Sequence, residues 1–274
     1  MNQEIQVIQA GKQEYRSCWE LQKQLAAARR AGQVPDLLLL VEHPPTYTIG
    51  RRGTRDHLLI DEARLQEVGA TCLTVDRGGD ITFHGPGQLV VYAIIDLGLT
   101  NRSVRRYVEN LEQVVIETLH HYELEATIDP AYPGVWIGRN KIAAIGISIH
   151  HGVSYHGFAL NIDPDLHYFD DMIGCGIPDR GATSLERELG RPVDAGEVTN
   201  LIVEQFATRF DIETRDDLTF DDLLHIVEQR PANNHAEEKS NDLASKHIRQ
   251  VVPQRTMMSV ATDQRTLLDM NRSR

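Results

Sequence analysis

The sequence predicts an α/β or α+β fold in which a mixed β-sheet is flanked by helices. Three features lead to this fold class: helical and strand-like segments occur in mixed order, neighbouring strands are joined by dipeptide turns, and one strand is a continuous apolar run. A chain of 274 residues can bury one sizeable core. Its composition, 41% hydrophobic and 25% charged, is typical of globular proteins.

The N-terminal half is predicted to contain helices interleaved with short strands. Residues 15–31 form a helix, since Trp19, Leu21 and Leu25 share one side and Gly32 follows. Apolar and β-branched runs predict strands at 36–43, 46–50 and 71–76, with a short helix near 61–68. Residues 77–97 are interpreted as a turn-forming half followed by a strand at 89–96. The next helix begins at Asn101 or Ser103 and continues to about residue 122.

The C-terminal half begins with a predicted antiparallel meander at 134–138, 141–150 and 153–163. Its turns are placed at Arg139-Asn140 and His151-Gly152. A short helix at 183–190 and a longer one capped by Asp194 follow, and 220–229 forms one more helix. We divide the chain into a main domain at 1–216 and an acidic, polar C-terminal extension at 217–274. Because 230–274 is polar with few aromatic residues, we expect part of the extension to be disordered.

The charge and cysteine content limit the possible partners and location. A net charge of −12 disfavours nucleic acid. Arginines cluster upstream, and an acidic partner could dock there, although solvated faces explain them equally well. These arginines are Arg29, Arg30, Arg51, Arg52, Arg55, Arg102, Arg105 and Arg106. Neither a secretory signal nor a membrane span is evident, and three cysteines suggest a reducing compartment, so we expect a cytoplasmic protein.

Cys175 is the candidate nucleophile, because it lies between two glycines in the loop FDDMIGCGIPDRG. A thiol there is reactive if a neighbour stabilises its thiolate; otherwise it is a small apolar residue in a turn. Lys141 begins the apolar strand KIAAIGISI, and is either a solvated strand end or a cation directed at the thiol. The glycine-rich RGGDITFHGPGQ either brings backbone amides to a ligand or forms an elaborate turn.

These segments together resemble the lipoyl(octanoyl) transferase family, the octanoyl-[acyl-carrier-protein]:protein N-octanoyltransferases. The matching pieces are RGGDITFHGPGQLVVY, GVWIGRNKIAAIGISI, HGFALNIDPDLHYF and IGCGI with ATSL downstream. They run from residue 42 to 189 in the family's order. Two positions depart from the pattern: Gly174 replaces an expected proline, and Asp80 is less typical than glutamine.

The resemblance implies a ping-pong acyltransferase on the biotin/lipoate ligase fold, with 1–216 as its catalytic domain. Cys175 would take an octanoyl group from octanoyl-acyl carrier protein and pass it to a lysine of a lipoyl domain. The acceptors would be 2-oxoacid dehydrogenase complexes and the glycine-cleavage carrier protein. Lys141 would stabilise the Cys175 thiolate and exchange protons. No cofactor or metal is implied, and we expect a monomer. The resemblance assigns substrate binding to Arg77, Gly78, Gly79, Asp80, Ile81, Thr82, Phe83, His84, Ala144, Ile145, Gly146, Gly157, Phe158 and Ala159.

Three alternative functions stay open at this point. An ATP-dependent lipoate or biotin ligase would leave Cys175 without a role, and a carrier-protein binding module would need no catalysis. A papain-like hydrolase would pair Cys175 with His84 or His156. Metal binding is not expected, because the pairs His120-His121 and His150-His151 diverge on a helix or strand. Cys18 and Cys72 are interpreted as packing residues. Rejecting longer acyl chains requires a bulky side chain at the closed end of the pocket.

Overall fold

The computed structural model describes residues 3–100, 103–174 and 180–229, and the side chains of 99–100 are not among them. The chain divides into two units, Met1–Gln229 and Arg230–Arg274. The second unit, on which our prediction of a disordered tail falls, lies outside the described residues.

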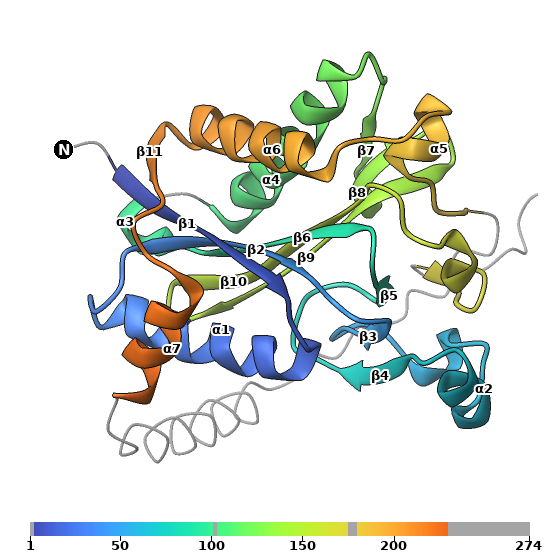
Figure 1. The fold of residues 1–274 in the computed structure, drawn as a ribbon, viewed down its shortest axis with the longest axis horizontal. Coiled ribbons are helices and arrows are strands. Elements are labelled where there is room, and N and C mark those ends of the chain that lie inside the picture. The colour runs from blue at the N-terminus through green and yellow to red at the C-terminus, as the bar shows by residue number, and fades with distance from the viewer. Residues whose placement is uncertain (1–2, 101–102, 175–179, 230–274) are drawn as a thin grey trace, which may run out of the picture. The chain divides into compact units, whose positions relative to one another are not determined.

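The described chain contains both helices and strands in mixed order (Figure 1). The helices are α1 Tyr15–Arg30, α2 Glu62–Glu67, α3 Leu97–Thr100, α4 Val104–His121, α5 Leu185–Leu189, α6 Ala195–Phe210 and α7 Phe220–Glu228. The strands are β1 Gln3–Lys12, β2 Asp36–Glu42, β3 Thr46–Ile49, β4 Thr71–Thr74, β5 Ile81–His84, β6 Gln88–Ile94, β7 Thr127–Asp129, β8 Tyr132–Ile137, β9 Asn140–His150, β10 Val153–Asn161 and β11 Ile212–Arg215.

The strands form two mixed sheets, which confirms the predicted fold class. The larger has the order β11-β1-β2-β6-β10-β9-β8-β7, and the smaller has the order β4-β3-β5. β1 pairs in parallel with β2 and β11, whereas β8, β9 and β10 form the predicted antiparallel meander. The turn between β9 and β10 has positive φ at His151 and Gly152, as a two-residue hairpin of type I′ requires.

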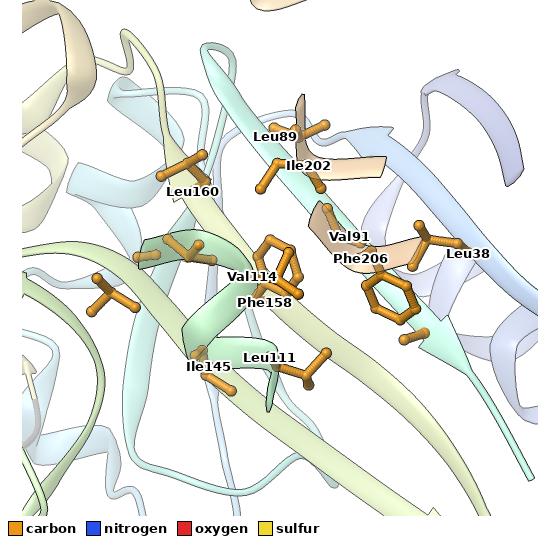
Figure 2. Packing of buried hydrophobic residues seen from close by; sticks show 14 of the residues in the cluster. Leu38, Leu89, Val91, Leu111, Val114, Ile145, Phe158, Leu160, Ile202 and Phe206 are labelled. Carbon is orange, nitrogen blue, oxygen red and sulfur yellow. The ribbon is translucent and has the colours of Figure 1, made fainter. Parts of the chain in front are cut away.

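Helices cover both faces of the large sheet. α4 and α6 lie on one face, and α1 and α7 lie on the other (Figure 1). The first face is sealed by a core to which sheet and helices contribute, including Val91, Phe158, Val114 and Phe206 (Figure 2). On the second face, α1 and α7 pack over β2 and β6 around Leu25, Leu39 and Leu223. The small sheet has its own core, centred on Tyr47 and Phe83.

Four strands were not predicted: β1, β5, β7 and β11. β5 corrects our interpretation of 77–88 as turns, because the segment turns only before and after Ile81–His84, and these four residues pair with β3. β11 is short and largely exposed, so it carries little hydrophobic pattern, and its pairing with β1 joins residues about two hundred positions apart. No helix among the described residues is both long and apolar enough to cross a membrane.

Candidate active site

A cavity of about 490 Å³, the inner cavity, lies beneath the loop 77–80 on the large sheet. Strands β6, β9 and β10 contribute its floor, and β5 contributes Thr82 and His84. Its lining includes Lys141 and every predicted substrate-binding residue except Phe83. Segments separated by up to eighty positions in the sequence therefore meet around one space. Phe83 instead stacks on Tyr168 at 4.4 Å inside the small-sheet core.

Small residues in the floor let backbone segments approach each other closely. β8 pairs with β9 over Asn140–Ala143, and beyond that point the loop 77–80 contacts β9, where the Gly78 N–H donates to the Ile147 carbonyl at 2.8 Å. A Cβ on Gly146 would lie 2.8 Å from the Gly78 carbonyl oxygen, and one on Gly157 would lie 2.1 Å from that of Val91. Neither position has room for a side chain. The Gly78 amide is engaged with the sheet and is not a free donor for an oxyanion.

The buried end of the inner cavity is built from aromatic rings. Tyr15, His84, Tyr92 and His156 line it, and each is at most 5% exposed. The more exposed part of the lining, by contrast, carries the exposed Arg51 and Arg52 and the partly exposed Lys141. The lining of the cavity therefore combines buried aromatic rings with more exposed cationic side chains.

His156 is held by polar contacts in a backbone conformation that is uncommon for a residue with a side chain. Its φ is +58° within β10, and its N–H donates to Gln22 Oε1 at 2.8 Å. Its Nε2 lies 2.9 Å from Asp76 Oδ1, which also accepts the Trp19 indole N–H at 2.9 Å. The Tyr155 hydroxyl donates to the other Asp76 oxygen.

These contacts set the ionisation of the cluster. Burial alone would raise the pKa of Asp76, but hydrogen bonds from His156, Tyr155 and Trp19 bring that pKa well below its usual value. Burial lowers the pKa of His156, and it lowers that of His84 much further. The Asp76 carboxylate is therefore charged and both imidazoles are neutral near pH 7.

Arg77 and Asp80 position the loop above the cavity. The Arg77 guanidinium is buried and donates to Thr48, with Nη2 2.6 Å from the carbonyl oxygen and 2.8 Å from Oγ1. Asp80, the residue that departs from the family pattern, is 2.6 Å from His57 Nδ1 and accepts the Ile81 N–H at 2.7 Å. Both side chains connect this loop to the small-sheet side of the protein.

Lys141 lies where the inner cavity meets a second, outer cavity of about 760 Å³. Its ammonium donates to the Pro133 carbonyl at 3.2 Å and lies 4.7 Å from the centre of the Trp136 ring. The Arg180 guanidinium is also 4.7 Å from this ring, and pairs with Asp129 at 2.7 Å. Trp136 is thus in contact with two cations at the wall of the outer cavity.

The chain on either side of Cys175 is fixed to its surroundings, although Cys175 itself lies outside the described residues. Before it, the Ile173 N–H donates to the His57 carbonyl at 2.8 Å. After it, the Lys141 N–H donates to the Gly181 carbonyl at 2.9 Å, and the Thr183 N–H donates to the Lys141 carbonyl at 3.0 Å. Gly174, Arg180 and Gly181 line the outer cavity together with Lys141.

The other two cysteines are poor nucleophiles. Burial raises the pKa of the Cys18 thiol to about 12, and burial also raises that of the Cys72 thiol. Both thiols stay protonated at neutral pH, as their interpretation as packing residues requires. Within the part of the chain that the structure describes, no three His, Cys, Asp or Glu side chains converge as metal ligands do.

Several residues around the site were not predicted. Tyr15 and Tyr92 occur in segments interpreted only as a helix and a strand, and Asp76 was placed at the end of a strand. Glu112 of α4 was taken as part of a helix, yet it is buried and accepts the Gly134 N–H at 3.2 Å. Burial raises the pKa of Glu112, and the nearby Lys141 charge opposes that rise. Nothing in the sequence marks Tyr15 and Tyr92 as cavity residues, because only their neighbours in the tertiary structure make them part of the lining.

The fold is that of the lipoate-protein ligases. A lipoate-protein ligase A solved with bound ATP has a TM-score of 0.64 with this chain at 16% identity, covering 84% of this chain and 94% of that one. A bipartite lipoate protein ligase from Thermoplasma acidophilum also has a TM-score of 0.64 at 16% identity, covering 83% and 91% of the two chains. At such identities the likeness concerns the fold alone, so the class that it defines is the lipoate-protein ligase fold.

The sequence relatives define the family more closely. Residues 14–207 match the lipoyl protein ligase A/B catalytic domain, and the chain belongs to this family. An octanoyltransferase of Rubrobacter xylanophilus is 50% identical over 195 residues, covering 70% of this chain and 87% of its own length. One from Alkaliphilus metalliredigens is 42% identical over 210 residues, with 76% and 96% covered. The chain is accordingly an acyltransferase that transfers octanoyl groups in protein lipoylation, between an acyl donor and a lipoyl-domain acceptor.

Proposed function

We propose that the chain transfers octanoyl groups from octanoyl-acyl carrier protein to lipoyl domains through a thioester on Cys175, with Lys141 as its proton-transfer partner. The acceptors are a specific lysine in the lipoyl domains of 2-oxoacid dehydrogenase complexes and in the glycine-cleavage carrier protein. The observation that carries the proposal is that residues on both sides of Cys175 border the cavity that Lys141 lines.

In the first half-reaction the Cys175 thiolate attacks the thioester carbonyl of the donor. The new carbon–sulfur bond forms as the bond to the pantetheine sulfur breaks. An ammonium on Lys141 stabilises the thiolate and supplies the proton that the departing pantetheine thiol takes up. The acyl chain lies in the inner cavity, above the floor formed by Ala144, Gly146, Gly157 and Ala159.

In the second half-reaction the amine of the acceptor lysine attacks the Cys175 thioester. An amide bond forms, the carbon–sulfur bond breaks, and Cys175 returns to its starting state. The neutral Lys141 amine accepts the proton that the attacking lysine loses. Lys141 thus ends each cycle in the protonation state in which it began, and the apparent pKa values belong to the Cys175–Lys141 pair.

A thioester donor is already activated, so this reaction consumes no ATP and needs no cofactor. The absence of ATP consumption distinguishes the proposed reaction from that of an ATP-dependent ligase on the same fold. A hydrolase differs in that water would receive the acyl group and the lipoyl domain would stay unmodified.

Intact-mass spectrometry after mixing the enzyme with octanoyl-acyl carrier protein, without ATP, tests the central step. We expect one octanoyl adduct on the wild type, and none on Cys175→Ser. The matched control is Cys72→Ser, which removes a thiol with a raised pKa and should keep the adduct. An adduct that persists in Cys175→Ser, or an unmodified wild type under conditions of turnover, would rule out the intermediate.

The role of Lys141 has its own readout. We expect Lys141→Ala to raise the pKa of the Cys175 thiol, measured as the pH dependence of its alkylation rate. An unchanged alkylation profile in a folded variant would remove Lys141 from the mechanism. We further propose that residues 1–216 are the catalytic domain and that the protein is a cytoplasmic monomer. Light scattering tests the monomeric state.

A further inference from the structure

We infer that Tyr92 and His156, with Tyr15 beside them, form the wall that limits acyl-chain length. This inference rests on the proposed function, in which the inner cavity holds the acyl group, and it names the residues that close that cavity. These rings form the buried part of the cavity lining, whereas Arg51, Arg52 and Lys141 belong to its more exposed part.

The rings form a continuous layer. Tyr92 and His156 are 6.1 Å apart between ring centres and nearly perpendicular, at 72°. The ring centre of Tyr92 lies 5.7 Å from that of His43. The ring centre of Tyr15 lies 4.9 Å from that of His43 and 5.2 Å from that of His84. All five rings are at most 5% exposed, so the layer is covered behind by the rest of the protein.

Polar contacts behind the layer prevent the rings from moving aside. His43 Nδ1 lies 2.7 Å from the Gln13 carbonyl oxygen and must donate to it, so His43 Nε2 accepts the Tyr92 hydroxyl at 2.7 Å. His156 is held by Asp76 and Gln22. A longer chain that displaced either ring would leave these buried polar groups unpaired, which is unfavourable.

The wall is uncharged, as contact with a terminal methyl group requires. Burial raises the pKa of Tyr15 to about 12 and raises that of Tyr92. Burial lowers the pKa of His43 to about 4, and it lowers those of His84 and His156. Tyrosines that stay protonated and neutral imidazoles present no net charge to an apolar chain end.

A steric limit is needed because apolar contact by itself favours longer chains. Each additional methylene that found room would tighten binding about fourfold. Selection against decanoyl and longer groups therefore depends on a wall that does not yield. Removing the Tyr92 ring should therefore allow each additional methylene of the acyl chain to tighten binding by about that factor.

The test compares acylation by octanoyl- and decanoyl-acyl carrier protein, as the ratio of the two kcat/KM values. For Tyr92→Val we expect this ratio to shift toward decanoyl by tenfold or more, since two methylenes are accommodated. Tyr92→Phe is the matched control: it also leaves His43 without the hydroxyl but keeps the ring, so its ratio should stay within twofold of the wild type. An unchanged ratio in folded Tyr92→Val would overturn the inference.

A second variant covers the possibility that Tyr92→Val does not fold, which circular dichroism would reveal. His156→Asn replaces the imidazole ring with a shorter side chain, and asparagine tolerates the left-handed backbone at this position. It should shift the ratio in the same direction, and an unshifted ratio counts against the wall. If the wild type accepts neither acyl group on Cys175, that result contradicts the proposed function, whereas an unchanged ratio in the variants contradicts the wall.

Discussion

A single carboxylate, Asp76, holds together the side chains behind the buried end of the inner cavity. It accepts hydrogen bonds from Trp19, Tyr155 and His156, which come from α1 and β10. Trp19 belongs to α1, and Tyr155 and His156 are neighbours in β10, so the carboxylate connects the helix, the strand and the loop that follows β4. Its charge is stabilised by these bonds, because they outweigh the unfavourable effect of burial on the pKa.

Asp76→Asn should lower the free energy of unfolding at pH 7 by about 1 kcal/mol, since three donors lose a charged acceptor whose partly exposed side chain is screened by solvent. The folded-state pKa of Asp76 is depressed, so its contribution is present above the unfolded pKa, about 3.9. That contribution is lost as the pH falls through the folded value. Urea unfolding at pH 7 and near pH 3 should therefore show a smaller difference between wild type and variant in acid.

The control for Asp76 is Glu20→Gln, which removes a surface carboxylate paired with Lys23 at 2.7 Å. Such pairs contribute well under about 1 kcal/mol, so this variant should unfold like the wild type. A difference between wild type and Asp76→Asn that is the same at both pH values would mean that the charge is not what stabilises the cluster.

Among the secondary-structure elements, α7 shows that the first compact unit includes residues beyond 216. A capping box at Thr219 and Asp222 begins the helix, and Leu223 is fully buried in the core shared with α1. The compact unit accordingly extends to Gln229, past residue 216, at which we divided the chain. Residues 217–229 contribute to folding whether or not they contribute to catalysis.

Leu223→Ala should destabilise the protein by about 2–4 kcal/mol, because it leaves a cavity between α7 and α1. Urea unfolding measures this, and ending the chain after Asp216 should lower stability at least as much. Leu59→Ala is the matched control, since Leu59 is 57% exposed, and it should change stability by less than about 0.5 kcal/mol. Equal effects of the two substitutions would show that α7 is not part of the folded core.

At the scale of the whole molecule, the local charge beside the inner cavity has the opposite sign to the net charge of the chain. The chain carries −12 overall, yet the exposed Arg51 and Arg52 line the inner cavity. The pantetheine arm of the proposed donor carries a phosphate, so a local positive charge at this cavity favours its approach despite the protein's net sign.

Replacing both Arg51 and Arg52 with serine should raise KM for octanoyl-acyl carrier protein about fivefold, corresponding to about 1 kcal/mol. The effect should shrink at high ionic strength, because exposed charges are screened. Steady-state kinetics at two salt concentrations measure it, with Arg30→Ser as a control, because Arg30 is exposed at the end of α1 and does not line the cavity. A loss that is independent of salt would contradict an electrostatic role.

Much of the fold could be predicted because the signals are local. Gly32, Asp194 and Gly190 mark helix ends, and His151-Gly152 marks a hairpin, each through the conformational preference of one or two residues. The strands that were missed, such as β5 and β11, lack such a pattern, since their stability comes from partners distant in the sequence. Of the residues 77–84, to which the resemblance assigns substrate binding, all but Phe83 line the inner cavity, and Phe83 packs in the core of the small sheet.

The sequence by itself determined the family, the fold class and the segments that surround the cavity, because motif residues and backbone preferences are properties of short stretches of chain. Only the tertiary structure decided that Tyr15, Tyr92 and His156 close one end of that cavity and that Asp76 and His43 hold them there. These residues are ordinary members of a helix and two strands until sheet pairing brings them together. Distances between side chains depend on that pairing, and no local pattern encodes it.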